Sequence, residues 1–401
     1  MQIQEERLAS IFFVPLVQVF VGVFLFIALL YGFRELALFT GILLGIGIGA
    51  YIWCRMSPLR IGCELGVDRQ RIFPGEKLKI SIQVVNAKYL PVLLKIAIHF
   101  DRFITGSDRE DTLFSKQCGL LWYQNSRFQK ELTPRRRGLY RVGPPDLMVG
   151  DLFGFHTREK IATTSVDIVV YPRLVEVKPL SLAKREFYGI PGARSPVEDP
   201  VYIYGTRDYQ PGSPARRIHW KASARHNRIQ EKLCEPAEQE KVMLLLEAGL
   251  FEEARAEGKF ERIIEIAASY AVWLDQQGHA VGFATNGILA GNGSLIIPIA
   301  RSPVQLSVIL ETLARVTMRS EVRLTDILSQ GYVMPWGVSC LAFAYEQGEA
   351  TAAIEASMRN RNIPTIFVHA QKTPGFSDDP YTGRAKSYNM DEIRIMEDRD
   401  P

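Results

Sequence analysis

Two long apolar stretches stand at the start of the chain. Residues 11–31 (IFFVPLVQVFVGVFLFIALLY) have Gln18 as their only strongly polar side chain, and residues 36–53 are interrupted only by Thr40. A helix needs about 20 apolar residues to cross the hydrocarbon core, whereas a secretory signal has a single, shorter apolar region. The pattern therefore predicts a membrane anchor over residues 1–60, made of two transmembrane helices in a hairpin.

Glycine recurs every four residues in the second stretch, at Gly41, Gly45 and Gly49. A face of small residues lets two membrane helices approach closely. Glycine is also frequent in membrane helices generally. Both interpretations of these three residues stay open.

The charges around the two stretches indicate an orientation. Arg7 precedes the first stretch, Arg55 and Arg60 follow the second, and the connection holds Arg34 beside Glu35. Since cytoplasmic flanks carry the excess of positive charge, both ends of the hairpin are expected in the cytoplasm. This predicts a multi-pass protein of the inner (plasma) membrane with cytoplasmic soluble domains.

Residues 61–179 have the pattern of antiparallel strands. Between Leu78 and Val84 apolar and polar residues alternate, directly after a Pro74-Gly75 turn, which is typical of a half-buried strand. Further stretches of this kind lie at 92–100, 126–132, 138–144 and 165–172. Several short strands with Gly and Pro between them predict a β-sandwich-like domain of the immunoglobulin-like or fibronectin-like kind, with a twisted open sheet as the alternative.

The pattern changes at residue 241. Residues 241–248 (KVMLLLEA) form a continuous apolar run, as in a strand buried on both faces of a parallel sheet. Residues 260–278 have helical spacing and end at Gly278. Further strands are predicted at 279–286, 294–300, 338–346 and 364–370, and helices at 351–361 and at 302–316, the latter capped by Ser302 with Pro303 as first residue. This alternation predicts a doubly wound α/β domain over residues 241–370, followed by a loosely ordered polar tail, residues 371–401.

Composition adds little to this division. The chain of 401 residues is 47% hydrophobic and 23% charged, with a net charge of +4, which fits a multidomain folded protein. Its five cysteines are scattered and form no CxxC pair. Neither a disulfide framework nor a zinc site is indicated, and a reducing compartment is expected.

One segment, IYGTRDYQPGSPARRIHWKASA at 203–224, differs from its surroundings. It lies in the linker region 180–240, and its turn predicts a helix capped by Ser213 with Pro214 as first residue. The segment matches no motif that reads a nucleic-acid groove, so no nucleic-acid partner is expected. Its residues that could form a structural or partner-docking element are Arg207, Asp208, Tyr209, Pro211, Gly212, Arg216, Arg217, His219, Trp220, Lys221, Ser223 and Arg225.

Catalytic and cofactor motifs are incomplete. Cys234, His219 and Asp208 supply the residue types of a nucleophilic triad, but such a triad is defined by geometry. After the first strand of the α/β domain, Glu247 stands where a von Willebrand factor A domain has the Asp of its DxSxS metal motif, and Gly249 and Phe251 replace the serines. Glu247 is interpreted as a solvated carboxylate or a helix-end charge rather than a ligand. No cofactor, metal site or catalytic residue is predicted.

The 203–224 segment resembles the bacterial membrane proteins of domain-of-unknown-function family 58. Their pattern R-x-Y-x-P-G-D-x-x-R-x-I-x-W-K-x-S-A-R is matched from Arg207 to Arg225, with Ser213 in place of the usual Asp. Residues 135–156 and 169–174 also resemble stretches of that family.

The resemblance implies a von Willebrand factor A-like domain joined to a membrane hairpin and a β-domain. It also implies an association with MoxR-type AAA+ ATPases. The expected function is that of a non-enzymatic, membrane-anchored adaptor or assembly factor, with the lipid bilayer and a MoxR-type ATPase or another membrane protein as partners. The alternatives are a hydrolase or transferase that uses Cys234 and His219, and a metal-dependent adhesion module that uses Glu247.

Overall fold

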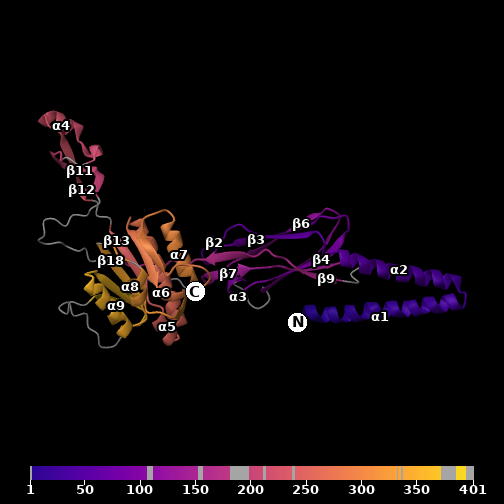
Figure 1. Ribbon diagram of the computed structural model, residues 1–401. Helices are drawn as coiled ribbons and strands as arrows, with labels where there is room; N and C mark the ends of the chain where they lie inside the picture. Colours follow the sequence, from indigo (N-terminus) through magenta and orange to yellow (C-terminus); the bar gives the residue numbers. More distant parts are fainter. Residues whose placement is uncertain are drawn as a thin grey trace. The chain divides into compact units, whose positions relative to one another are not determined.

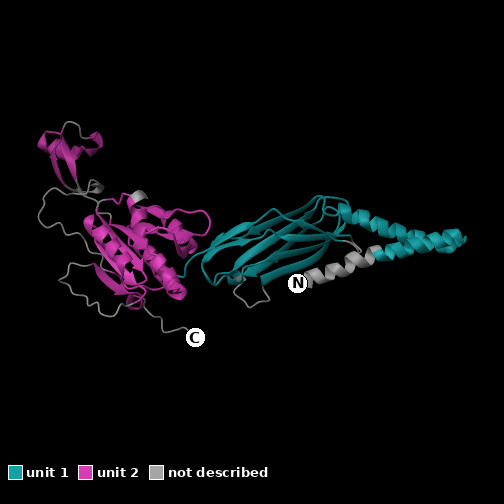
Figure 2. Cartoon of the chain, turned by 60° about the horizontal axis from the view of Figure 1, so that its bottom comes forward, with its two compact units in different colours: residues 1–173 teal, residues 174–401 magenta. Residues whose placement is uncertain are grey.

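The computed structural model describes residues 2–105, 112–151, 157–180, 198–210, 214–236, 240–331, 333–335, 337–371 and 385–393. The chain divides into two compact units, residues 1–173 and residues 174–401 (Figure 2). The first contains N-terminal helices and β-sheets, and the second contains a mixed α/β sheet (Figure 1). The protein is therefore multidomain, as the sequence predicts.

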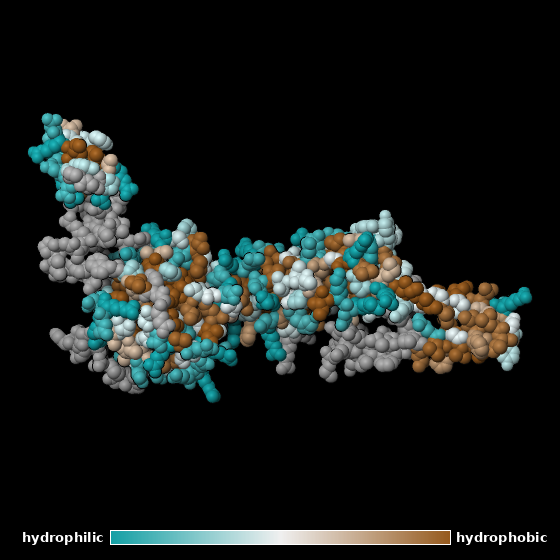
Figure 3. All heavy atoms as spheres, viewed as in Figure 1, coloured by the Kyte–Doolittle hydropathy of each residue, from teal (hydrophilic) through white to brown (hydrophobic). Residues whose placement is uncertain are grey.

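Two helices, α1 (Gln2–Leu30) and α2 (Arg34–Met56), open the first unit. Among the described residues, α2 is the one helix long and apolar enough to cross a membrane, and Leu16–Leu30 of α1 is a shorter apolar segment. Figure 3 shows apolar side chains over the described part of both helices. One membrane-spanning helix near the N-terminus is thus supported by length and composition.

Among the described side chains, the close approach of α1 and α2 is not at the glycines of the four-residue spacing. A Cβ added at Gly41, Gly45 or Gly49 would meet none of these side chains within 4 Å. A Cβ at Gly47 would lie 2.8 Å from Nε2 of Gln18 on α1. The close approach occurs at Gly47 because the polar Gln18 side chain packs against this glycine.

Residues 61–170 form three sheets, ordered β1-β3-β6, β2-β10-β7 and β5-β4-β8-β9. The strands are β1 (Ile61–Val67), β2 (Arg71–Ile72), β3 (Leu78–Asn86), β4 (Val92–His99), β5 (Leu113–Leu120), β6 (Asn125–Leu132), β7 (Gly138–Val142), β8 (Asp146–Gly150), β9 (Thr157–Ile161) and β10 (Val166–Val170), with the short helix α3 (Arg102–Thr105) after β4. The predicted alternation in β3 is confirmed, since Leu78, Ile80, Ile82 and Val84 are buried.

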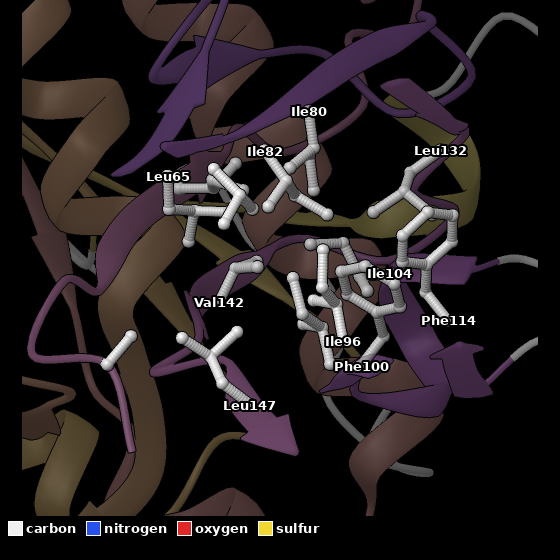
Figure 4. Close-up of a cluster of buried hydrophobic side chains, with 14 of the residues drawn as sticks. Leu65, Ile80, Ile82, Ile96, Phe100, Ile104, Phe114, Leu132, Val142 and Leu147 are labelled. Atoms are coloured by element: carbon white, nitrogen blue, oxygen red, sulfur yellow. The ribbon is translucent and has the colours of Figure 1, made fainter. Parts of the chain in front are cut away.

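One hydrophobic core joins these sheets. Ile80 and Ile82 of β3 are directed toward Ile96 of β4 and Leu147 of β8, which belong to another sheet (Figure 4). All four side chains are fully or almost fully buried. The β-rich region is therefore stabilised as a layered structure by the burial of apolar side chains between its sheets.

The second unit is built on a six-stranded sheet ordered β16-β14-β13-β18-β19-β20. Its strands are β13 (Lys241–Leu246), β14 (Ala280–Thr285), β16 (Ile296–Ala300), β18 (Val338–Ala344), β19 (Thr365–His369) and β20 (Lys386–Asn389). They are parallel except for β16, which pairs antiparallel at one edge. A separate pair is formed by β15 (Gly287–Leu289) and β17 (Val316–Ser320).

Helices cover both faces of this sheet. The helices are α5 (Gly249–Glu253), α6 (Glu257–Gln276), α7 (Gln305–Arg315), α8 (Leu324–Gly331), α9 (Glu349–Asn360) and α10 (Met390–Ile393). Met243 and Leu245 of β13 share a core with Leu328 of α8 and Met358 of α9. On the other face, Tyr270 of α6 lies against Phe343 of β18, with ring centroids 6.3 Å apart. The continuous apolar runs of β13 and β18 follow from this two-sided burial.

Two sequence predictions in this unit are wrong in detail. Helix α7 begins at Gln305 after Val304, without a side-chain cap, so Ser302 and Pro303 precede the helix rather than start it. Residues 385–393 of the predicted tail are ordered: β20 adds a parallel strand beside β19, and Met390 and Ile393 are buried. The tail prediction failed there because a polar edge strand needs only a few apolar residues to dock.

Candidate functional site

The 203–224 segment connects two antiparallel strands, β11 (Glu198–Asp208) and β12 (Gln230–Pro236). The connection contains a 3₁₀ turn, η2 (Ala215–Arg217), and a short helix, α4 (Trp220–His226). Pro211, Gly212 and Ser213 lie outside the described residues. We call this unit, residues 198–236, the β11–α4–β12 element.

A buried carboxylate lies at the centre of the element. The Glu231 side chain of β12 is 1% exposed, and its Oε2 lies 3.4 Å from Nε of Arg207, the residue opposite it on β11. Its Oε1 lies 3.6 Å from a guanidinium nitrogen of Arg217 in η2. Two of the segment's arginines therefore pair with one carboxylate and join β11, η2 and β12.

His219 starts helix α4. Its Nδ1 accepts a hydrogen bond of 3.1 Å from the backbone N–H of Ala222, which is the contact of an N-cap residue. The helix predicted to begin at Pro214 is thus wrong in its start. Ile218 between η2 and α4 is extended and forms a β-bridge with Glu231, which interrupts the helical backbone.

Ser223 ties α4 to the start of β12. Its hydroxyl donates to the carbonyl of His219 at 3.0 Å and accepts from the backbone N–H of Gln230 at 2.8 Å. The N–H of His219 in turn donates to the carbonyl of Gln230 at 2.7 Å. These bonds fix the orientation of the helix on the strand pair.

Asp208 and Tyr209 also bond within the element. The Asp208 carboxylate pairs with Arg228 at 3.2 Å and accepts from the amide of Gln230. The N–H of Tyr209 donates to the carbonyl of Ile229 at 2.9 Å. The described contacts of Arg207, Asp208, Tyr209 and Ser223 therefore serve the local fold.

Helix α4 carries an exposed tryptophan and two exposed cations. Trp220 is 72% exposed, and Lys221 and Arg225, one helical turn apart from each other, are exposed on the same helix. Arg216 of η2 is exposed as well. We call these four exposed residues of one short segment the Trp220 face.

The three residues of the hypothetical triad are not assembled. Asp208 lies opposite Gln230, whereas Cys234 lies opposite Ile203, farther along the strand pair. Four residues of strand separate Gln230 from Cys234, a distance of about 13 Å. His219 also uses Nδ1 to cap α4. A Cys-His-Asp relay does not follow from this arrangement.

The loop after β13 holds a second polar cluster. Glu247 is buried, and its carboxylate accepts hydrogen bonds of 3.1 Å from the N–H groups of Gly249 and Leu250 at the start of α5. The amide of Asn286, after β14, donates to Glu247 at 3.0 Å and accepts from the N–H of Ala248 at 2.8 Å. Glu247 is therefore not solvated, and of the two interpretations the helix-end charge is confirmed. Within the described part of the chain, no three His, Cys, Asp or Glu side chains form a metal-binding group.

His369, at the carboxyl end of β19, is buried and stacks on Phe367 with ring centroids 5.7 Å apart. Burial lowers the pKa of His369 to about 4. The unfolded chain therefore takes up a proton at a higher pH than the folded chain does, and stability is lost as the pH falls below about 6.5.

We expect acidification from pH 6.5 toward pH 4 to destabilise the second unit through His369 by at most about 1.4 kcal/mol per pH unit. His369→Phe keeps an aromatic ring but does not titrate, so its stability should fall less steeply. Denaturant unfolding at several pH values measures this difference. Parallel pH profiles for both proteins would contradict the assignment.

Comparison with known proteins places the β11–α4–β12 element in a family. Residues 205–331 match the family described as "Protein of unknown function DUF58", and this range begins within β11. Residues 205–331 are a DUF58 region. The resemblance stated from the 203–224 segment is confirmed.

A curated relative of the chain is the "Uncharacterized protein YeaD" of Bacillus subtilis (strain 168). It is 23% identical over 274 residues, which cover 67% of this chain and 63% of that protein. The aligned part thus spans less than two thirds of the relative's length.

Among solved structures, the CARDB domain of the PF1109 protein from Pyrococcus furiosus is 16% identical and covers 27% of this chain and 91% of its own, with a TM-score of 0.20. A PapD-like domain of human CEP192 is 15% identical and covers 26% and 82%, with a TM-score of 0.18. Neither likeness is close enough to assign a fold.

Sequence reasoning missed Glu231 as the centre of the element. The available signal was the pairing of two short strands. A strand ending in Arg207-Asp208 and a later strand starting with Gln230-Glu231 place opposite charges across an antiparallel pair.

Proposed function

We propose that this protein is a non-enzymatic, membrane-anchored adaptor or assembly factor that binds a protein partner through the Trp220 face. The observation that carries the proposal is the contrast within one short segment. Arg207, Arg217, His219 and Ser223 have contacts that build the element, while Trp220 remains 72% exposed. Exposed tryptophan flanked by cations is typical of a binding surface.

The partner we propose is a MoxR-type AAA+ ATPase or another membrane protein with an acidic docking surface. Lys221, Arg225 and Arg216 favour acidic side chains around a pocket that takes the Trp220 ring. The family resemblance supports the choice of ATPase. Arginine and lysine at the rim would speed association, and the buried indole would supply most of the affinity.

The finer architecture belongs to the same proposal. We propose that α1 and α2 cross the inner membrane as a hairpin and that both soluble units are cytoplasmic. The flanking Arg7, Arg55 and Arg60 support this orientation. The six-stranded sheet with helices on both faces supports a doubly wound, von Willebrand factor A-like domain without its metal motif.

Trp220→Ala is expected to raise the Kd for the MoxR-type ATPase at least about tenfold, because a hot-spot tryptophan contributes about 1.4 kcal/mol or more. Its folding should be unchanged, since the side chain is largely exposed. Binding is measured between the detergent-solubilised full chain and the purified ATPase. Val304→Ala, which removes another exposed apolar side chain of the second unit, is the control. Equal affinity for both variants would remove the Trp220 face from the proposal.

A further inference from the structure

Two neighbouring loops of the β-rich region expose a cluster of aromatic side chains. Tyr89, in the β3–β4 loop, is 80% exposed, and Trp122 and Tyr123, in the β5–β6 loop, are 60% and 56% exposed. The rings of Tyr89 and Tyr123 meet edge to face with centroids 4.8 Å apart. We call Tyr89, Trp122 and Tyr123 the aromatic collar.

The collar is held in place by the backbone beneath it. The buried Asn86 amide donates to the carbonyls of Leu90 and Leu121 at 2.9 and 2.8 Å, which joins the two loops. The N–H of Tyr123 donates to the carbonyl of Lys88 at 3.2 Å. Hydrogen bonds therefore hold together the two loops that carry the exposed rings, so binding costs little conformational entropy of these loops.

The same loops are fastened to the end of α2. The Lys88 ammonium donates to the carbonyls of Met56, Ser57 and Leu59, where the last helical carbonyls lack intrahelical partners. The indole N–H of Trp53 donates to the carbonyl of Pro91 at 2.8 Å. The collar thus lies beside the point where the apolar helix ends.

Exposing three aromatic rings to water is unfavourable in free energy, but next to an apolar helix such rings suit the interface between the hydrocarbon core and the lipid headgroups. Tyr and Trp have an apolar body and a polar tip, and they concentrate where hydrocarbon meets headgroups. Leu121 in the same loop and Leu59 after α2 are also more than half exposed. Exposed apolar side chains therefore lie both beside the collar and just after the end of α2.

We propose that the aromatic collar is immersed in the interfacial layer of the bilayer that α2 enters, so that the β-rich region rests on the membrane rather than hanging free from it. This inference rests on the proposed membrane anchoring. It assigns the lipid bilayer as the occupant of the collar, and it makes the α2 end and the two loops a single membrane-contacting surface.

The test is hydroxyl-radical footprinting of the full chain in nanodiscs of phosphatidylcholine and phosphatidylglycerol, loaded at one copy per disc. Oxidation of each residue is compared with the same residue in the denatured protein. Trp122, Tyr89 and Tyr123 should be protected severalfold despite their exposure in the protein alone. Tyr51 and Met56 of α2, both half exposed in the protein alone, report the anchoring itself.

The outcomes separate the two ideas. Protection of Tyr51 and Met56 with rapid oxidation of Trp122 would leave the anchor in place and overturn the collar. Rapid oxidation of Tyr51 as well would overturn the anchoring and the collar together. Protection of the collar only in discs that hold several copies would show that a second copy of the chain covers it, and this would also overturn the lipid assignment.

Discussion

Glu231→Ala is expected to unfold the β11–α4–β12 element while the six-stranded sheet stays folded. The substitution removes the carboxylate to which both Arg207 and Arg217 pair and leaves two guanidiniums without it. Breaking a fully buried ion pair costs about 3–5 kcal/mol. Here the arginine side chains are 46% and 37% exposed and regain water, so we expect about 2–3 kcal/mol.

Amide hydrogen exchange measures this loss locally. Protection of Arg207 and Lys232 on the paired strands should fall in Glu231→Ala, and the amides of β13 should keep theirs. Glu231→Gln, which keeps the shape and loses the charge, should lie between wild type and the alanine variant.

Arg228→Ala is the matched control for Glu231→Ala. It breaks an ion pair in the same element, that of Arg228 with Asp208, whose side chains are 70% and 65% exposed. Exposed pairs contribute about 0–1 kcal/mol. If Arg228→Ala loosens the element as much as Glu231→Ala does, the buried carboxylate is not its centre.

The sequence predicts the elements whose burial is regular and misses those decided by tertiary contacts. Alternation in β3 and the apolar run of β13 follow from one-sided and two-sided burial, so both could be predicted. The start of α4 could not. A capping histidine and an extended Ile218 depend on bonds to β12, which lies beyond the turn in sequence.

In the candidate site, too, one part could be predicted from the sequence and another could not. Its residues could be chosen from composition, but their roles depend on burial. Arg217 and Trp220 look equally capable of binding a partner in sequence, yet one pairs with Glu231 and the other faces outward. Of the two interpretations of Glu247, the helix-end charge was correct because a carboxylate before a short helix has a local role that pattern alone indicates. The solvated alternative was wrong because burial depends on tertiary contacts.

Gly287→Ala is the second large effect we expect, in the sheet domain. A Cβ at this position would lie 2.6 Å from the carbonyl oxygen of Thr317 and from a methyl of Val316, and 3.1 Å from Cβ of Ala248. One of these neighbours is backbone in the paired strand β17, so the clash cannot be relieved by a side-chain rotation. Overpacking of this kind costs about 3 kcal/mol. The added methyl group would also displace the neighbouring Asn286, whose side-chain amide donates a hydrogen bond to Glu247.

Gly258→Ala on α6 is the control. It shows whether the loss of stability comes from the lack of space around Gly287 or from replacing any glycine by alanine. A Cβ at Gly258 would meet nothing within 4 Å, and alanine favours the helix by up to about 1 kcal/mol. Thermal unfolding of the second unit should therefore shift down in Gly287→Ala and stay or rise in Gly258→Ala. Amide exchange at Ala248, which donates to Asn286, should accelerate only in the first. Equal unfolding temperatures would mean that β17 yields to the added methyl group, and the packing around Glu247 would then be looser than its hydrogen bonds indicate.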